Sequence, residues 1–143
     1  MPTTETYRQA PSLAKVFVKA ALSGKKSGSA LPDTSLVLAG HRVDREHLMD
    51  YQRLCGFGVD DVLPHTYPHI LGFPLQAELM GRGAFPLPLA GLVHVENTIT
   101  VRRTLTAADV LDVAETIGYF AWDANRAVTG NVVRVCGQML VGA

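Results

Sequence analysis

The sequence predicts an α+β domain, because segments with the spacing of amphipathic helices stand between segments with the alternation of strands. Two helices are predicted near the middle of the chain, over 44–56 and 66–79, and strand patterns flank them at 35–41 and 91–103. The length of 143 residues fits one domain. A chain of this size buries roughly two thirds of its unfolded surface, which is enough for a true core.

The first 30 residues are expected to form an N-terminal arm and a linker. Ser12 can cap a short helix, because apolar residues follow it at helical spacing. The stretch 24–29 contains only Gly, Ser and Lys, a composition typical of flexible linkers.

The two central helices are predicted from their end signals. Asp44 can cap the first, and Gly56 is placed to end it in a left-handed conformation. The second is expected to begin near Thr66 and to continue through Leu79, with Pro74 introducing a kink.

The last third of the chain predicts a strand, a helix and a second strand. Residues 91–103 alternate between apolar and polar side chains, which indicates a long strand with one wet face. Thr106 and Asp109 resemble a capping box, and the apolar spacing that follows predicts a helix over 106–122. A short strand is expected at 131–136.

Composition excludes several classes of protein. Thirteen basic and thirteen acidic residues give a formal net charge of zero, without the basic excess that nucleic-acid binding usually needs. No apolar run reaches the roughly 18 residues of a membrane span, and the N-terminus has no signal-peptide pattern. Two cysteines provide neither a disulfide framework nor a metal-ligand spacing. We therefore expect a cytoplasmic protein without nucleic-acid or membrane partners.

Residues 31–105 resemble the MaoC-like acyl-thioester dehydratases and hydratases. The resemblance depends on three stretches, whose letters are LPHTYPHILGFP at 63–74, AFPLP at 84–88 and GLVHVEN at 91–97. It is similar in particular to the non-catalytic first half of the double-hot-dog members. It implies a partial hot-dog fold, in which a long helix lies against a curved antiparallel sheet.

This resemblance also implies a function. Its members act in fatty-acid metabolism as (R)-specific enoyl-thioester hydratases or 3-hydroxyacyl-thioester dehydratases, on chains carried by coenzyme A (CoA) or acyl carrier protein (ACP). No cofactor is implied. A homodimer, or association with another hot-dog or reductase subunit, is expected because the predicted strands are too few to close a sheet. The alternatives are a non-catalytic, acyl-thioester-binding accessory subunit and a fragment related to 3-oxoacyl-thioester reductases.

The reductase alternative comes from residues 106–143, which we treat as a separate C-terminal segment. The stretches DVAETI at 112–117 and VVRVCG at 132–137 resemble the C-terminal end of short-chain dehydrogenase/reductases. In that family the pattern is a late helix followed by the last strand. Hydride transfer is not expected, because the chain has neither a glycine-rich nucleotide turn after a strand nor a Tyr-x-x-x-Lys motif.

Hydration of an enoyl thioester needs a general acid and base and a donor to the thioester oxygen. Asp60 precedes His65 by five residues, the spacing that the family uses, but the surrounding Asn-Pro text is missing. These two residues are the catalytic candidates, and the alternative is a polar turn before a helix. His65 and His69 would share a helix face, yet two ligands are too few for zinc, so no metal site is predicted.

Four further residues are candidates for substrate binding. Tyr67 and Phe73 could line an acyl tunnel or belong simply to the core. His94 lies on the polar side of the predicted strand and could face an acyl cleft or solvent. Asn97 interrupts the apolar side, so its amide would need buried partners or a ligand.

Overall fold

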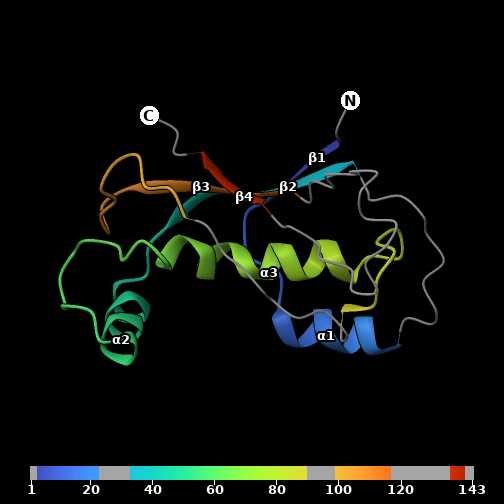
Figure 1. Cartoon of the computed structure of the whole chain (residues 1–143), viewed down its shortest axis with the longest axis horizontal. Helices are drawn as coiled ribbons and strands as arrows, with labels where there is room; N and C mark the ends of the chain where they lie inside the picture. The colour runs from blue at the N-terminus through green and yellow to red at the C-terminus, as the bar shows by residue number, and fades with distance from the viewer. Residues whose placement is uncertain (1–2, 23–32, 90–98, 117–135, 141–143) are drawn as a thin grey trace, which may run out of the picture.

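A computed structural model defines the fold for residues 3–22, 33–89, 99–116 and 136–140 (Figure 1). These described residues form three helices and four strands, which confirms the predicted α+β class. In chain order they are β1 (Thr3–Tyr7), α1 (Leu13–Leu22), β2 (Thr34–Arg42), α2 (Arg45–Cys55), α3 (Tyr67–Gly81), β3 (Val110–Thr116) and β4 (Cys136–Leu140).

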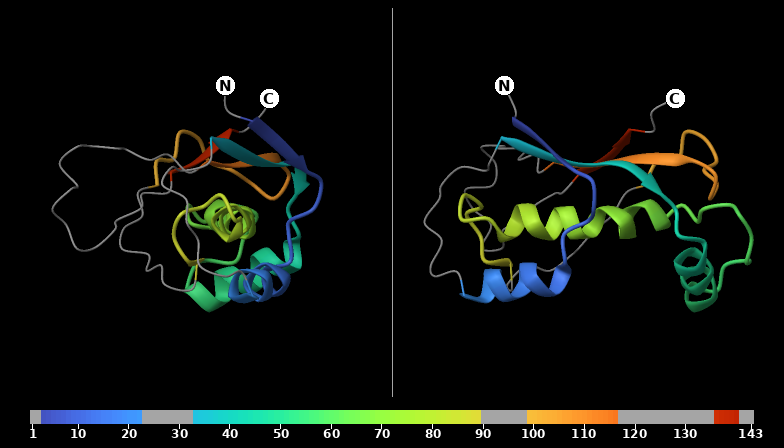
Figure 2. Two further views of the ribbon diagram at one scale, coloured as in Figure 1. Left: turned by 90° about the vertical axis from the view of Figure 1, so that its right-hand side faces the viewer. Right: turned by 180° about the vertical axis from the view of Figure 1, so that it is seen from behind.

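The elements are arranged in layers around α3 (Figures 1 and 2). The sheet lies along one side of α3, α1 packs on the other side, and α2 lies beside the first turn of α3. A helix with neighbours on both sides is apolar around most of its circumference, as the sequence of α3 is. The long helix against a curved sheet is compatible with the predicted partial hot-dog fold.

The sheet has the strand order β1-β2-β3-β4. β1 runs parallel to β2, whereas β2 with β3 and β3 with β4 are antiparallel. A parallel pair needs a crossover connection, and α1 lies within the one between β1 and β2. Among the described strands, β1 and β4 are therefore the two edges.

The core lies between the sheet and α3. Leu36 and Leu38 of β2 and Leu111 and Val113 of β3 are buried with alternating spacing, so they share one face of the sheet. The buried apolar residues of α3 that complete the cluster are Tyr67, Leu75, Ala77, Leu79 and Met80. Burial of the apolar surface of this cluster provides the hydrophobic driving force that holds α3 against the strands.

β2 confirms the strand predicted at 35–41 and contains a bulge. Its register against β3 shifts between Leu38 and His41, where Gly40 has a φ of 65°. The Gly40 N–H donates to Asp112 Oδ1 at 2.7 Å. A side chain of β3 thus satisfies an amide that the ladder leaves out, which stabilises the bend at the end of β2.

Both central helices are confirmed, and so are their end signals. Asp44 caps α2 by accepting from the N–H groups of Glu46 and His47, and Gly56 ends it with a φ of 73°. Thr66 is the residue before α3, and α3 continues through Pro74 to Gly81.

The helix predicted at 106–122 is wrong over its described part, because Val110–Thr116 forms β3. Asp109 does bond back to Thr106, with Oδ2 accepting from the Thr106 N–H at 2.7 Å, but the bond closes a turn instead of starting a helix. Leu111 and Val113 alternate as buried residues between β2 and β4. Tertiary pairing thus overrides a spacing that also fits a helix. Residues 117–122 lie outside the described ranges.

The strand predicted at 91–103 does not form in its described part. Residues 99–103 have no strand structure, and Ile99 and Val101 are exposed instead of facing a core. Residues 91–98 lie outside the described ranges. The strand expected at 131–136 overlaps β4 only at Cys136, because β4 continues to Leu140 and 131–135 are also outside them.

The N-terminal stretch contributes two elements to the fold. The short helix predicted after Ser12 is confirmed as α1. β1 is held to the end of α3 by Arg82, whose two terminal nitrogens donate to the two Glu5 carboxylate oxygens at 2.6 and 2.7 Å. The linker predicted at 24–29 lies outside the described ranges.

Candidate functional site

The two catalytic candidates lie in the loop that joins α2 to α3. Asp60 Oδ1 accepts from the Val62 N–H at 2.8 Å, which is a local turn bond. The His65 ring is exposed and lies edge-on to the ring of Phe57, with the centroids 6.1 Å apart. Of the hydrogen bonds described for these two residues, none joins one to the other.

The same loop is fixed from beneath by Gln52 of α2. This side chain is 1% exposed, and its Nε2 donates to the carbonyl oxygens of Asp60 and Val62, both at 3.0 Å. Two bonds from one buried amide hold the backbone on either side of Asp61 in place. The backbone at Asp60 is therefore held in place by hydrogen bonds from Gln52.

A hollow of about 390 Å³ opens beside this loop. Its lining includes Asp60 and the ion pair between Arg45 and Asp61, while Leu48 and Met49 of α2 supply apolar surface. The hollow brings one catalytic candidate, Asp60, to a concave surface, but His65 is not among its lining residues.

Tyr67 begins α3 and is fully buried. Its hydroxyl is hydrogen-bonded to Nδ1 of His47 at 2.8 Å, and the two rings lie 5.6 Å apart. A neighbouring bond of 2.6 Å joins the Tyr51 hydroxyl to Thr66 Oγ1. These contacts attach α2 to the first turn of α3, so Tyr67 has a structural partner.

Burial sets the electrostatics of this junction. Burial raises the pKa of Tyr67 to about 12, and the negative charge of Asp44 adds to the shift. The pKa of His41 is lowered below its usual value, mainly by burial and to a smaller extent by the nearby His47. Both effects favour the uncharged forms of Tyr67 and His41.

The other three residues predicted to bind substrate are Phe73, His94 and Asn97. Phe73 is half-buried on α3, one turn before Gln76. His94 and Asn97 lie outside the described ranges. Within the described ranges, His65 and His69 belong to no group of three or more His, Cys, Asp or Glu side chains that could hold a metal ion.

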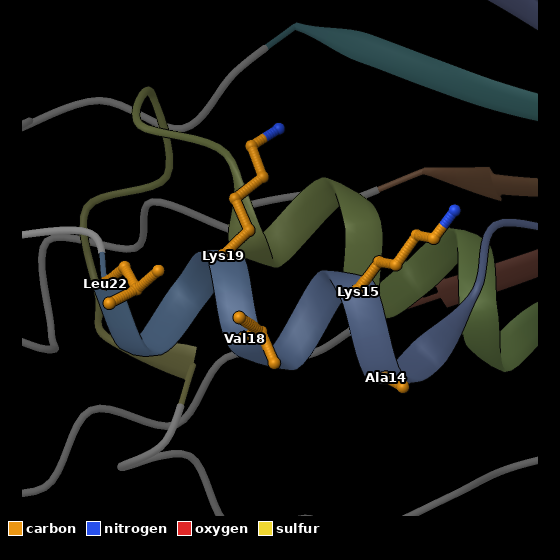
Figure 3. Close-up of a pocket in the computed structure, with 5 residues that line it drawn as sticks. All are labelled: Ala14, Lys15, Val18, Lys19 and Leu22. Carbon is orange, nitrogen blue, oxygen red and sulfur yellow. The ribbon is translucent and has the colours of Figure 1, made fainter.

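A second concave surface lies along the outer side of α1. It measures about 620 Å³ and is lined by residues of this helix, which are Ala14, Lys15, Val18, Lys19 and Leu22. Figure 3 shows Lys15 and Lys19 extending from one side of the helix. The surface is open and mostly apolar, in keeping with the exposure of Val18 and Leu22.

Sequence reasoning missed the residues that stand out most in the structure. The His47–Tyr67 bond joins residues 20 positions apart, and no spacing rule indicates it. Gln52 and Gln76 are the buried polar side chains among those described, and both occur in segments predicted as helices. A polar residue within an apolar helix face was the signal that could have found Gln76.

Comparison with known proteins gives one informative similarity. Over 83 residues, 58% of the chain, the sequence is 29% identical to 3-hydroxyacyl-thioester dehydratase X of Mycobacterium tuberculosis (strain ATCC 25618 / H37Rv). The matched part spans 30% of that protein's length. No protein-family model matches the chain, and no solved structure matches it significantly. Among the described helices, none is long and apolar enough to cross a bilayer.

Proposed function

We propose that this chain binds acyl thioesters of fatty-acid metabolism, as the acyl-binding part of a dehydratase-type protein. The observation that carries the proposal is the setting of α3, an apolar helix of 15 residues packed against the inner face of a curved sheet. The apolar side chains around such a helix suit a hydrocarbon chain, since ligand sites are largely apolar with few polar groups. The similarity to a 3-hydroxyacyl-thioester dehydratase supplies the substrate class.

The specific substrates of this proposal are enoyl and 3-hydroxyacyl thioesters carried by CoA or ACP. Binding without turnover is favoured, because the Asp60 carboxylate is engaged by its own loop and shares no described bond with His65. A second chain would then complete the catalyst. The β1 and β4 edges of the described sheet are suitable places for it, since an unpaired strand edge readily accepts another strand.

A second candidate function is hydration by this chain itself. It is favoured by the position of Asp60 at a hollow of about 390 Å³ and by the exposure of His65. Asp60 would act as the general base toward water, and His65 would protonate the carbon next to the thioester. The (R)-specific outcome belongs to this second candidate.

Calorimetric titration and a hydration assay separate the two. We expect decenoyl-CoA to bind and free CoA to bind much more weakly, because the acyl chain supplies the apolar contact. We expect no loss of enoyl absorbance with crotonyl-CoA as substrate. Turnover abolished by Asp60→Asn and by His65→Ala would establish the second candidate. Equal affinities for decenoyl-CoA and free CoA would overturn the acyl-binding proposal.

A further inference from the structure

Gln76 is a polar side chain in the middle of the apolar helix α3. It is 6% exposed, and its Oε1 is buried without a hydrogen-bond partner. The residues directly before and after it in the chain, Leu75 and Ala77, are fully buried and apolar. An acceptor left unpaired in such surroundings destabilises the fold, because it loses its hydration and gains nothing in return.

The other buried glutamine provides a contrast. Gln52 also has an unpaired Oε1, but its Nε2 pins the loop through the carbonyls of Asp60 and Val62. That side chain therefore has a structural purpose that an apolar residue could not fulfil. The structure describes no comparable bond for Gln76, and a methionine of nearly the same shape would fill its space without leaving an unpaired acceptor.

The helix face that carries Gln76 also carries Phe73. Positions three and four apart lie on one side of a helix, so Gly72, Phe73, Gln76 and Met80 form one stripe along α3. Gly72 has no side chain, and Phe73 is half-buried. The stripe thus combines an aromatic surface, a position without side-chain bulk and one hydrogen-bond acceptor.

We infer that Gln76 is a specificity-determining residue, whose Oε1 accepts a hydrogen bond from the 3-hydroxyl group of a bound 3-hydroxyacyl thioester. The inference rests on the proposed acyl-thioester binding and names the ligand that the site prefers. A saturated chain has no donor at that carbon and would leave Oε1 unpaired. A site built to bond a hydroxyl discriminates against the analogue that lacks it.

The test compares two ligands and three proteins by calorimetric titration. The wild-type chain is expected to bind 3-hydroxydecanoyl-CoA about tenfold more tightly than decanoyl-CoA, which corresponds to one recovered hydrogen bond. Gln76→Met is expected to bind both equally. Gln52→Met serves as the matched control and is expected to keep the tenfold ratio.

Thermal unfolding without ligand adds a second measurement. Gln76→Met should raise Tm, because it removes an unpaired buried acceptor, whereas Gln52→Met should lower Tm by releasing the loop. A wild-type chain that binds both ligands with equal affinity, or a Gln76→Met variant that keeps the preference or lowers Tm, would overturn the inference alone. A wild-type chain that binds neither ligand would overturn the proposed function and the inference with it.

Discussion

Replacement of Tyr67 by phenylalanine isolates the hydroxyl that links α2 to α3. The ring is 0% exposed and remains buried in the variant, so the change removes only the 2.8 Å bond to His47 Nδ1. His47 is exposed and can regain a bond to water. The loss should therefore be one net hydrogen bond, about 1 kcal/mol. For a chain of this size that lowers Tm by about 4 °C.

The pH dependence of this difference gives a sharper test. Burial raises the pKa of Tyr67 to about 12, while an unfolded tyrosine has a pKa of about 10. The contribution of Tyr67 to stability is complete below about pH 10 and is lost as the pH rises toward about 12, since the unfolded chain releases its proton first. The stability advantage of the wild type over Tyr67→Phe should therefore shrink above about pH 10.

Urea unfolding followed by circular dichroism measures both effects, because the same two proteins can be compared at each pH. Tyr51→Phe is the matched control, since it removes the neighbouring hydroxyl, whose partner is Thr66. An advantage that stays constant from about pH 9 to about pH 11 would refute the assignment of a buried, proton-retaining Tyr67. So would a Tyr67→Phe variant as stable as the wild type at neutral pH.

Three further changes test other parts of the fold. Gly56→Ala should cost about 1 kcal/mol in urea unfolding, because the residue has a φ of 73°, whereas Gly58→Ala should cost less since no positive φ is found there. Arg82→Lys should weaken the paired bonds to Glu5, and the Arg82 hydrogen bond is what lowers the pKa of Glu5. The stability that this pair contributes above about pH 4.5 should be lost in acid for the wild type and to a smaller extent for the variant. Identical acid profiles for the two proteins would count against the pairing. Burial lowers the pKa of His41, so wild-type stability should decline as the pH falls below about 6.5, and His41→Gln should flatten that decline; an unchanged slope would contradict it.

Local signals in the sequence predicted the centre of the fold well. Asp44 and Gly56 lie where the capping rules place them, because a cap is a short-range bond between neighbours in the chain. Thr66 precedes α3, as the proline in the first turn of that helix predicts. β2 was identifiable from its continuous apolar run. These elements need no information from distant parts of the chain.

The later part of the chain shows why local signals were insufficient. Val110 and Val113 fit one face of a helix, yet residues 110–116 pair with β2 on one side and β4 on the other. That choice depends on partners about 75 residues earlier and about 25 residues later in the chain, which no window of neighbouring residues contains. At 99–103 the alternation was present, but Ile99 and Val101 had no core to face.

The candidate site was only partly accessible to sequence reasoning. Asp60 and His65 were identifiable by spacing, although the structure assigns the Asp60 carboxylate to its own turn. Tyr67 was predicted to line an acyl tunnel or to belong to the core, but its bond to His47 depends on how two helices pack. The environment of Gln76 depends in the same way on packing, because burial on α3 comes from layers on both sides.

Amide hydrogen–deuterium exchange with and without decenoyl-CoA tests most directly whether the interior beside α3 receives an acyl chain. The account predicts slower exchange in α3 and in the β2 and β3 strands that face it when decenoyl-CoA is present, and no such change with free CoA. Protection restricted to the outer surface of α1, or an α3 that exchanges at the same rate under saturating decenoyl-CoA, would contradict the account.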